Sequence, residues 1–489
     1  MAQQASGSAD GTAAPLLPSV PAGGATRRNR FAFVCATLAS MTTMLHGYNL
    51  TLMSGAQLFM REDVGLTDAE VEVLAGSMNV FMLTSILAAG WVADQLGRRR
   101  TLVLANAFLM AGALAMSLGG SFATLMAARF ITSVGAGFAR VVAPVYNAEI
   151  SPASTRGALS SMLDIFINVG MLLSYVSNYA FAGLPVRLGW RVMYAIGVVP
   201  PVFIAAGVSF MPESPRWLAM RGRHGDAHAV LLRTSDTPAE AGLRLAEIKQ
   251  AVAAAPQPAG NGGGGGVWKE LLVRSSSSAT TVRRILTCVL GLQFFVQASG
   301  VDAILLYSPL VFKAAGMASS GAALGATVAI GAVKTCFILV GMLFTDRLGR
   351  RPLLLASTAG VAVTTACLAA MLSVATAAPS AAAAAACLAS VLAVVAAYSV
   401  GYGSVVNTYS AEILPLRLRA QGSSLGVAVN RLTCGVVSMT FISLADGITM
   451  AGCFFLYAGV TAAAFVFVYA RLPETKGRSL EDMEALFNE

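Results

Sequence analysis

Charged residues are scarce in this chain of 489 residues. Asp, Glu, Lys and Arg make up 12% of the sequence and apolar residues 56%, whereas soluble proteins carry about twice that charged share. Residues 31–60 and 101–128 contain no charged side chain, and residues 352–411 form one long uncharged stretch. A bilayer core requires roughly 20 apolar residues per helical span. The composition therefore excludes a soluble globular protein and indicates a polytopic membrane protein.

Cysteine is also sparse and shows no pattern. All seven cysteines lie within apolar segments and none forms a CxxC pair, so disulfides, a metal site and a cofactor are not expected. No nucleophile–base set, phosphate-binding loop or metal cluster is recognisable, which argues against an enzyme. The first 30 residues do not have the layout of a signal peptide, because a polar stretch precedes an apolar segment of full spanning length.

Apolar segments of spanning length recur along the chain and predict an all-α fold of twelve transmembrane helices. The expected spans are 31–57, 71–93, 101–120, 124–148, 157–182, 190–211, 284–312, 322–345, 352–375, 382–411, 421–445 and 449–470.

Lys and Arg accumulate on one side of this topology. If both termini lie on the same side, that side receives most of the 33 basic residues. Because basic loops mark the cytoplasmic face, both termini are expected in the cytoplasm. The net charge of +9 then reflects contact with the anionic leaflet of the lipid bilayer rather than with nucleic acid.

Three sequence motifs occur twice, each pair separated by about half of the chain. This repetition predicts two six-helix bundles that bind substrate between them and rock around it. The motif pairs are Asp94-Gln-Leu-Gly-Arg-Arg with Asp346-Arg-Leu-Gly-Arg-Arg, Tyr146-Asn-Ala-Glu149 with Tyr409-Ser-Ala-Glu412, and Pro212-Glu-Ser-Pro-Arg with Pro473-Glu-Thr-Lys-Gly-Arg. The expected divisions are a disordered cytoplasmic N-terminus (1–30), an N-terminal bundle (31–211), a cytoplasmic helical linker (212–283), a C-terminal bundle (284–471) and a cytoplasmic tail (472–489).

The repeated acidic and basic residues lie at predicted helix ends, where they can form ion pairs. We expect such pairs to hold the two halves together in the outward-open state and to break when the cytoplasmic side opens. The alternative is that the basic turns only mark the cytoplasmic side. The predicted gating residues are Asp94, Arg98, Arg99, Glu149, Arg156, Asp346, Arg350, Arg351, Glu412 and Arg419.

These motifs in this order, with Arg129 in the fourth span and Gln293…Gln297-x-x-Gly in the seventh, resemble the sugar-porter family of the major facilitator superfamily over about residues 30–485. Stretches such as Asn178-Tyr-Ala-Phe and Val429-Asn-Arg431 are similar to plant polyol/monosaccharide transporters. The resemblance implies the major facilitator fold, a location in the plasma membrane with the vacuolar membrane as the alternative, and transport of polyols and monosaccharides, usually driven by proton symport.

Polar residues at membrane depth define the expected substrate site. By resemblance, Asp164 occupies a sugar-contacting position, and we expect Lys334 to pair with Asp302 when the site is empty. Amides and carboxylates suit a polyol because they exchange hydrogen bonds with neighbouring hydroxyls, although the glutamines could instead only connect helices. The predicted substrate-binding residues are Asp164, Gln293, Gln297, Asp302, Lys334, Asn407 and Asn430.

The sequence departs from the resemblance at the proton-coupling position. Proton-coupled relatives carry Gly-Tyr-Asp in the first span, whereas this chain has Gly47-Tyr48-Asn49. Asparagine takes up no proton, so Arg129 should lack its partner and coupling at this site should be absent. Asp164 could substitute, because a carboxyl near cations can change its pKa between states. Asn49, Arg129 and Asp164 are thus the proton-coupling candidates.

Three further departures lie in the expected cleft. Ser404 and Asn407 stand where the family has Pro and Trp, and Arg140 adds a charge to the fourth span. Arg140 either pairs with Asp164 or obstructs the substrate. These changes leave a transport-deficient sugar sensor as the alternative to a carrier.

Overall fold

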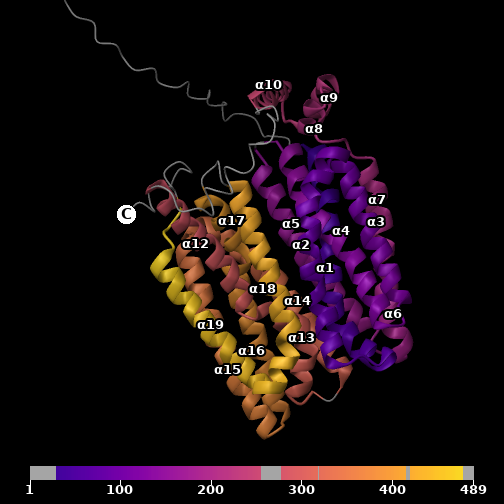
Figure 1. The fold of residues 1–489 in the computed structure, drawn as a ribbon, viewed down its shortest axis with the longest axis vertical. Helices are drawn as coiled ribbons and strands as arrows, with labels where there is room; N and C mark the ends of the chain where they lie inside the picture. The colour runs from indigo at the N-terminus through magenta and orange to yellow at the C-terminus, as the bar shows by residue number, and fades with distance from the viewer. Residues whose placement is uncertain (1–28, 153, 255–276, 318, 415–418, 477–489) are drawn as a thin grey trace, which may run out of the picture.

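A computed structural model of the chain describes residues 29–152, 154–254, 277–317, 319–414 and 419–476. Within these residues the regular structure is helical, which confirms the predicted all-α fold. The long helices run side by side in two groups, α1 to α7 and α12 to α19 (Figure 1). The helices are α1 (Arg30–Val64), α2 (Asp68–Leu96), α3 (Arg98–Leu118), α4 (Phe122–Ile150), α5 (Arg156–Ala180), α6 (Val186–Ile196), α7 (Val199–Ser209), α8 (Pro215–Met220), α9 (His224–Thr234), α10 (Pro238–Ala254), α12 (Ser277–Ala298), α13 (Val301–Ala314), α14 (Ser320–Leu348), α15 (Arg350–Ala377), α16 (Ala381–Val400), α17 (Tyr402–Ile413), α18 (Arg419–Ile448) and α19 (Met450–Arg471).

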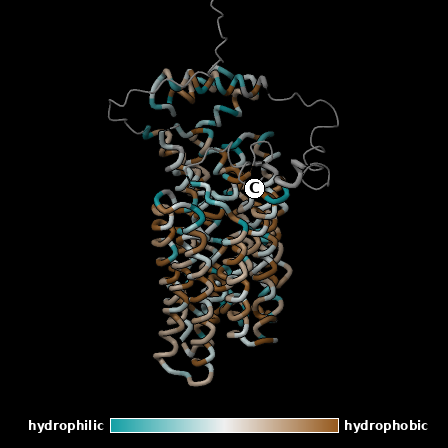
Figure 2. Tube along the Cα trace, turned by 90° about the vertical axis from the view of Figure 1, so that its left-hand side faces the viewer, coloured by the Kyte–Doolittle hydropathy of each residue, from teal (hydrophilic) through white to brown (hydrophobic). Residues whose placement is uncertain are grey.

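Eleven helical segments in the described residues are long and apolar enough to cross a membrane. Three of them join consecutive helices, namely α6 with α7, α12 with α13, and α16 with α17. The helix α1 adds a twelfth rod of spanning length, less apolar because it buries polar residues such as His46, Asn49 and Gln57. The predicted twelve-helix arrangement is thereby confirmed. Figure 2 shows hydrophobic residues along the bundle and hydrophilic ones concentrated at the end that carries α8 to α10. We call this end the linker end.

Two helices of the second group are interrupted near their middle by glycine. Gly300 separates α12 from α13 in the left-handed conformation (φ 76°), which glycine adopts without strain. Gly401 separates α16 from α17, and a Cβ there would lie 2.3 Å from the Cβ of Ser357. The helix is thus interrupted although Ser404 replaces the family's proline. Both interruptions place irregular backbone beside the cavity described below.

The two helix groups touch mainly where α2 packs along α18, α5 along α14 and α1 along α13. Gln57 on α1 donates to the main-chain oxygen of Leu306 (3.1 Å), and Tyr175 on α5 donates to that of Leu305 (2.9 Å). Near the end opposite the linker, Glu72 accepts hydrogen bonds from the amide and the hydroxyl of Ser443. These contacts close the bundle at the end away from the linker.

Candidate functional site

A cavity that is partly open to solvent lies between the two helix groups. Side chains of α1, α4 and α5 line it on one side, and side chains of α12, α13, α14, α16, α17 and α18 on the other. All seven predicted substrate-binding residues line this single cavity: Asp164, Gln293, Gln297, Asp302, Lys334, Asn407 and Asn430. A neighbouring pocket shares Asp164 with it and extends to Arg350 at the linker end.

Amide side chains form a connected network on one wall of the cavity. Asn430 donates to Gln293 Oε1 (2.9 Å) and accepts from Gln297 Nε2 (3.2 Å). Gln293 Nε2 in turn lies 3.5 Å from Asn407 Oδ1 and 3.4 Å from Ser410 Oγ. Gln297 Oε1 is buried without a partner in the described part of the chain. The network therefore fixes the amides in position and leaves an acceptor for a bound hydroxyl.

The expected ion pair between Lys334 and Asp302 is not formed in this conformation. The Lys334 ammonium donates to the sulfur of Met171 on α5 (3.4 Å), and Asp302 accepts from Cys434 on α18 (3.2 Å). The two side chains thus turn toward different helices, and no ion pair in the described residues joins them.

Arg140 and Asp164 both face the cavity and do not pair with each other. The Asp164 side chain is exposed to the cavity, and Arg140 is half-buried. Neither side chain has a hydrogen bond or ion pair to any described residue. Sequence left open whether Arg140 pairs with Asp164, and in this conformation it does not.

Several lining residues were missed from the sequence. His46 is buried on α1, and its Nδ1 atom has no partner among the residues described. Asn168 on α5 and the tyrosines Tyr398 and Tyr402 also line the cavity. These residues are neutral and merge into apolar spans, although a histidine at membrane depth is itself a functional signal.

Arg129 lies outside this cavity lining and is almost fully buried. It donates to the main-chain oxygens of Leu74 and Asn49, each at 3.3 Å, and lies near the sulfur of Met78. The Asn49 amide instead donates to the oxygen of Leu45 (2.9 Å). Arg129 therefore has no carboxylate partner within the described ranges, as the asparagine at position 49 predicts. The loss of proton coupling stays a prediction.

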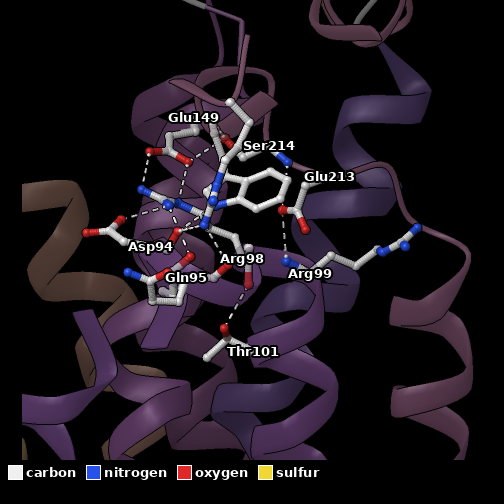
Figure 3. A network of polar contacts seen from close by, with 12 residues as sticks. Asp94, Gln95, Arg98, Arg99, Thr101, Glu149, Glu213 and Ser214 are labelled. Carbon is white, nitrogen blue, oxygen red and sulfur yellow. Dashed lines mark hydrogen bonds and ion pairs between the residues drawn. The ribbon is translucent and has the colours of Figure 1, made fainter. Parts of the chain in front are cut away.

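At the linker end, the three repeated motifs of the first half meet in one polar network (Figure 3). Arg98 on α3 pairs with Glu149 on α4 (3.1 Å) and with Asp94 on α2 (2.9 Å). Glu149 also accepts from the hydroxyl of Ser214. Glu213 accepts from the main-chain amide of Arg99 (3.0 Å).

The second half repeats this network with its own copies of the motifs. Arg350 on α15 pairs with Glu412 on α17 (3.0 Å), which also accepts from the hydroxyl of Thr475 (2.7 Å). Glu474 accepts from the main-chain amides of Arg350 and Arg351, each at 3.0 Å. The side chains of Arg156, Asp346 and Arg419 lie outside the described part of the structure.

Each of these ion pairs joins helices of the same half. The pairs Arg98–Glu149 and Arg350–Glu412 therefore do not join the two halves in this conformation, and the expected latch of the outward-open state stays a prediction. Both ion pairs are formed in a conformation in which the contacts that close the bundle lie at the end away from the linker. A gating role for these residues stays a prediction about other states.

The glycine of each Gly-Arg-Arg turn is required by its backbone and by its neighbour. Gly97 and Gly349 have φ angles of 93° and 97°. A Cβ at Gly97 would lie 2.4 Å from Glu213 Oε2, and one at Gly349 would lie 2.9 Å from Glu474 Oε2. The first and third motifs are thus in direct contact in both halves.

The fold and the cavity define a membrane carrier of the alternating-access type. Residues 35–487 match the family described as "Sugar (and other) transporter", and the chain belongs to this family. It is 48% identical to "Polyol transporter 5" of Arabidopsis thaliana over 97% of this chain and 88% of that protein. It is 49% identical to "Putative polyol transporter 1" of the same plant, covering 94% and 92%. These relatives support the carrier interpretation over the sensor.

Solved structures show the same fold. The inward-open conformation of the E. coli xylose transporter XylE superposes with a TM-score of 0.78 at 24% identity, covering 93% of this chain and all of that one. The proton:xylose symporter XylE bound to 6-bromo-6-deoxy-D-glucose gives 0.74 at 25% identity, covering 94% and 100%.

We expect Gly97→Ala to destabilise the protein by roughly 1–3 kcal/mol, because alanine is strained at positive φ and its Cβ would displace Glu213. Thermal unfolding of the purified protein measures the effect. The control is Gly90→Ala on α2, where a Cβ would meet no atom within 4 Å. Equal unfolding midpoints for the two variants would contradict the required contact between the motifs.

The pKa of Glu474 predicts a pH-dependent contribution to stability. Burial acts to raise this pKa, but hydrogen bonds from the main-chain amides of Lys476, Arg350, Arg351 and Thr475 outweigh it and hold the pKa below its ordinary value. The stabilisation is therefore present above the ordinary glutamate pKa of about 4.3 and is lost as the pH falls below it. The unfolding midpoint of Glu474→Gln should lie below the wild-type midpoint at pH 7, and the two should converge in acid. Glu62→Gln, exposed near the far end of α1, is the control, and a constant difference at all pH values would contradict the assignment.

Proposed function

We propose that this protein is a secondary carrier that moves polyols and monosaccharides across a membrane by alternating access. The observation that carries the proposal is the cavity between the two halves that is lined by amides, carboxylates and tyrosines. Such groups exchange hydrogen bonds with several hydroxyls in a fixed geometry. The names of the plant relatives, which are called polyol transporters, point to the same cargo.

The amide network supplies the orienting contacts in this proposal. Gln297 Oε1 accepts from one hydroxyl of the cargo, and Asp164 accepts from others on the opposite wall. A buried acceptor left without a partner costs free energy, so compounds that lack the matching hydroxyl bind more weakly. Selection of polyhydroxylated cargo follows from these acceptors.

The conformation described above is inward-open in this proposal. The basic residues of the linker end place that end and both termini in the cytoplasm by the positive-inside rule, and the plasma membrane is the expected location. The closing contacts Gln57–Leu306 and Glu72–Ser443 then lie on the outer side. They break when the carrier opens outward, while the ion pairs within each half persist or rearrange at the cytoplasmic end.

Proton coupling at the contact between α1 and α4 is absent in this proposal. Arg129 contacts main-chain oxygens there. The side-chain amide of Asn49 does not take up a proton at physiological pH. Asp164, which lines the cavity, is the candidate for carrying a proton in place of a carboxyl at position 49. In this proposal, no proton bound at the α1–α4 contact drives transport.

Uptake into proteoliposomes tests the proposal. Labelled sorbitol, mannitol, inositol, xylose and glucose are offered with and without a pH gradient, and we expect uptake of at least one polyol that the gradient does not concentrate. Asn49→Asp should introduce pH dependence, because it restores a carboxylate beside Arg129. No uptake of any compound overturns the carrier proposal, and gradient-driven accumulation by the wild type overturns only the absence of coupling.

Replacement of Asp164 tests the cavity assignment. Asp164→Ala should weaken the apparent affinity for the transported polyol by about 10- to 100-fold, because hydrogen bonds to a charged acceptor contribute roughly 1.5–3 kcal/mol. Concentration dependence of uptake measures this change. The matched control is Asp63→Ala, which removes a carboxylate paired with Arg191 (3.1 Å) away from the cavity. Unchanged affinity in Asp164→Ala would remove this residue from the site.

A further inference from the structure

The cavity carries more positive charge than a neutral cargo balances. Five of its lining side chains are ionisable, three basic and two acidic: Arg140, Lys334, Arg431, Asp164 and Asp302. Counted with their ordinary charges at pH 7 and leaving His46 aside, these side chains give the lining one net positive charge. An unbalanced charge at membrane depth is costly unless water or a ligand compensates it.

No ion pair within the described residues neutralises these three cations. Lys334 donates to a thioether sulfur. Arg431 donates to the amide oxygens of Asn430 (2.6 Å) and Asn79 (3.1 Å), which are neutral acceptors. Ion pairs in the described structure occur instead at helix ends and in the linker.

Arg140 is distinct from the other two cations because its side chain makes no hydrogen bond or ion pair to a described residue, although the charges of Arg431 and Asp164 act on it. Its side chain is half-buried on α4 and faces the same cavity as Asp164. A guanidinium presents two parallel N–H donors that match the two oxygens of a carboxylate. A singly charged carboxylate at this position would also bring the charge of the cavity lining to zero.

We propose that Arg140 forms an anion subsite within the cavity and that the carrier accepts polyhydroxy monocarboxylates, such as aldonates, in preference to uncharged polyols of the same length. The proposal rests on the proposed carrier function and specifies its substrate class. The carboxylate binds the Arg140 fork, and the hydroxyl chain extends toward Asp164 and the amide network on α12 and α18. A doubly charged phosphate ester would leave the cavity with excess negative charge, which favours the monocarboxylate.

Counterflow exchange tests this subsite in the full-length protein. Proteoliposomes loaded with sorbitol take up labelled sorbitol, and gluconate competes against gluconamide, which has the same carbon chain and no charge. In the wild type, gluconate should inhibit at a concentration about 10- to 100-fold lower than gluconamide. Arg140→Met should abolish this difference, measured as the ratio of the two inhibitory concentrations, and Arg140→Lys should keep part of it. Arg187→Met removes an exposed arginine away from the cavity and should leave the difference intact.

The outcomes separate this inference from the proposed function. Equal inhibition by gluconate and gluconamide in the wild type, with sorbitol exchange intact, overturns the anion subsite and leaves the polyol carrier standing. If sorbitol does not exchange, uptake of labelled gluconate is measured instead. Gluconate uptake that Arg140→Met abolishes supports the subsite and overturns the proposal of an uncharged cargo. No gluconate uptake overturns both proposals. The unfolding midpoint of purified protein with gluconate or gluconamide provides a readout for a variant that inserts poorly. A larger increase with gluconate that Arg140→Lys retains and Arg140→Met loses supports the subsite, and equal increases overturn it.

Discussion

A charge buried at membrane depth must find an opposite charge, a hydrogen-bonding oxygen, water or a ligand, and this requirement governs the arrangement of the protein. The structure meets it in three ways. Arg98 and Arg350 pair with glutamates at the linker end. Arg129 uses main-chain oxygens inside the bundle. Arg140 faces the cavity instead, where the proposed partner is an anionic group of the cargo. The position of each arginine thus decides whether it braces the fold or acts on the substrate.

Duplication of the motifs gives each half its own brace. Glu149 connects Arg98 with Ser214, and Glu412 connects Arg350 with Thr475. Each brace joins the end of a spanning helix to the segment that follows the last span of its half. The halves are therefore stiff units, and a change of access needs to exchange only the contacts between them. Hydrogen bonds to a few side chains and main-chain oxygens can be exchanged at modest cost, because each contributes only about 1 kcal/mol net.

Much of the fold could be predicted because the bilayer sets the length of the uncharged segments. The repeated motifs, in turn, indicate two similar halves. The seven residues predicted to bind substrate line one cavity, since polar side chains at membrane depth are rare and face the interior. The directions of the side chains could not be predicted. Lys334 and Asp302 turn toward different neighbours because Met171 and Cys434 lie on other helices, and sequence spacing does not report that geometry. His46 was missed because the search for ionisable residues within the spans considered Asp, Glu, Lys and Arg and did not include histidine.

The contact between Gly97 and Glu213 escaped prediction for a related reason. The turn and the carboxylate are distant in sequence, and only the folded chain shows that the first and third motifs share one network. Repetition revealed that both motifs matter, but it did not reveal that they meet. Sequence patterns did not predict which distant segments of this protein pack against each other.

Two departures from the family pattern act in the same electrostatic direction. Asn49 removes a carboxylate from α1, and Arg140 adds a cation to α4, so both changes make the interior of this helix pair more positive. A proton bound in the cavity would increase that positive charge further, whereas an anion would reduce it. The same two residues that weaken the case for proton uptake thus strengthen the case for an anionic group on the cargo. The two residues thus change the charge of the same helix pair in one direction, Arg140 within the cavity lining and Asn49 outside it.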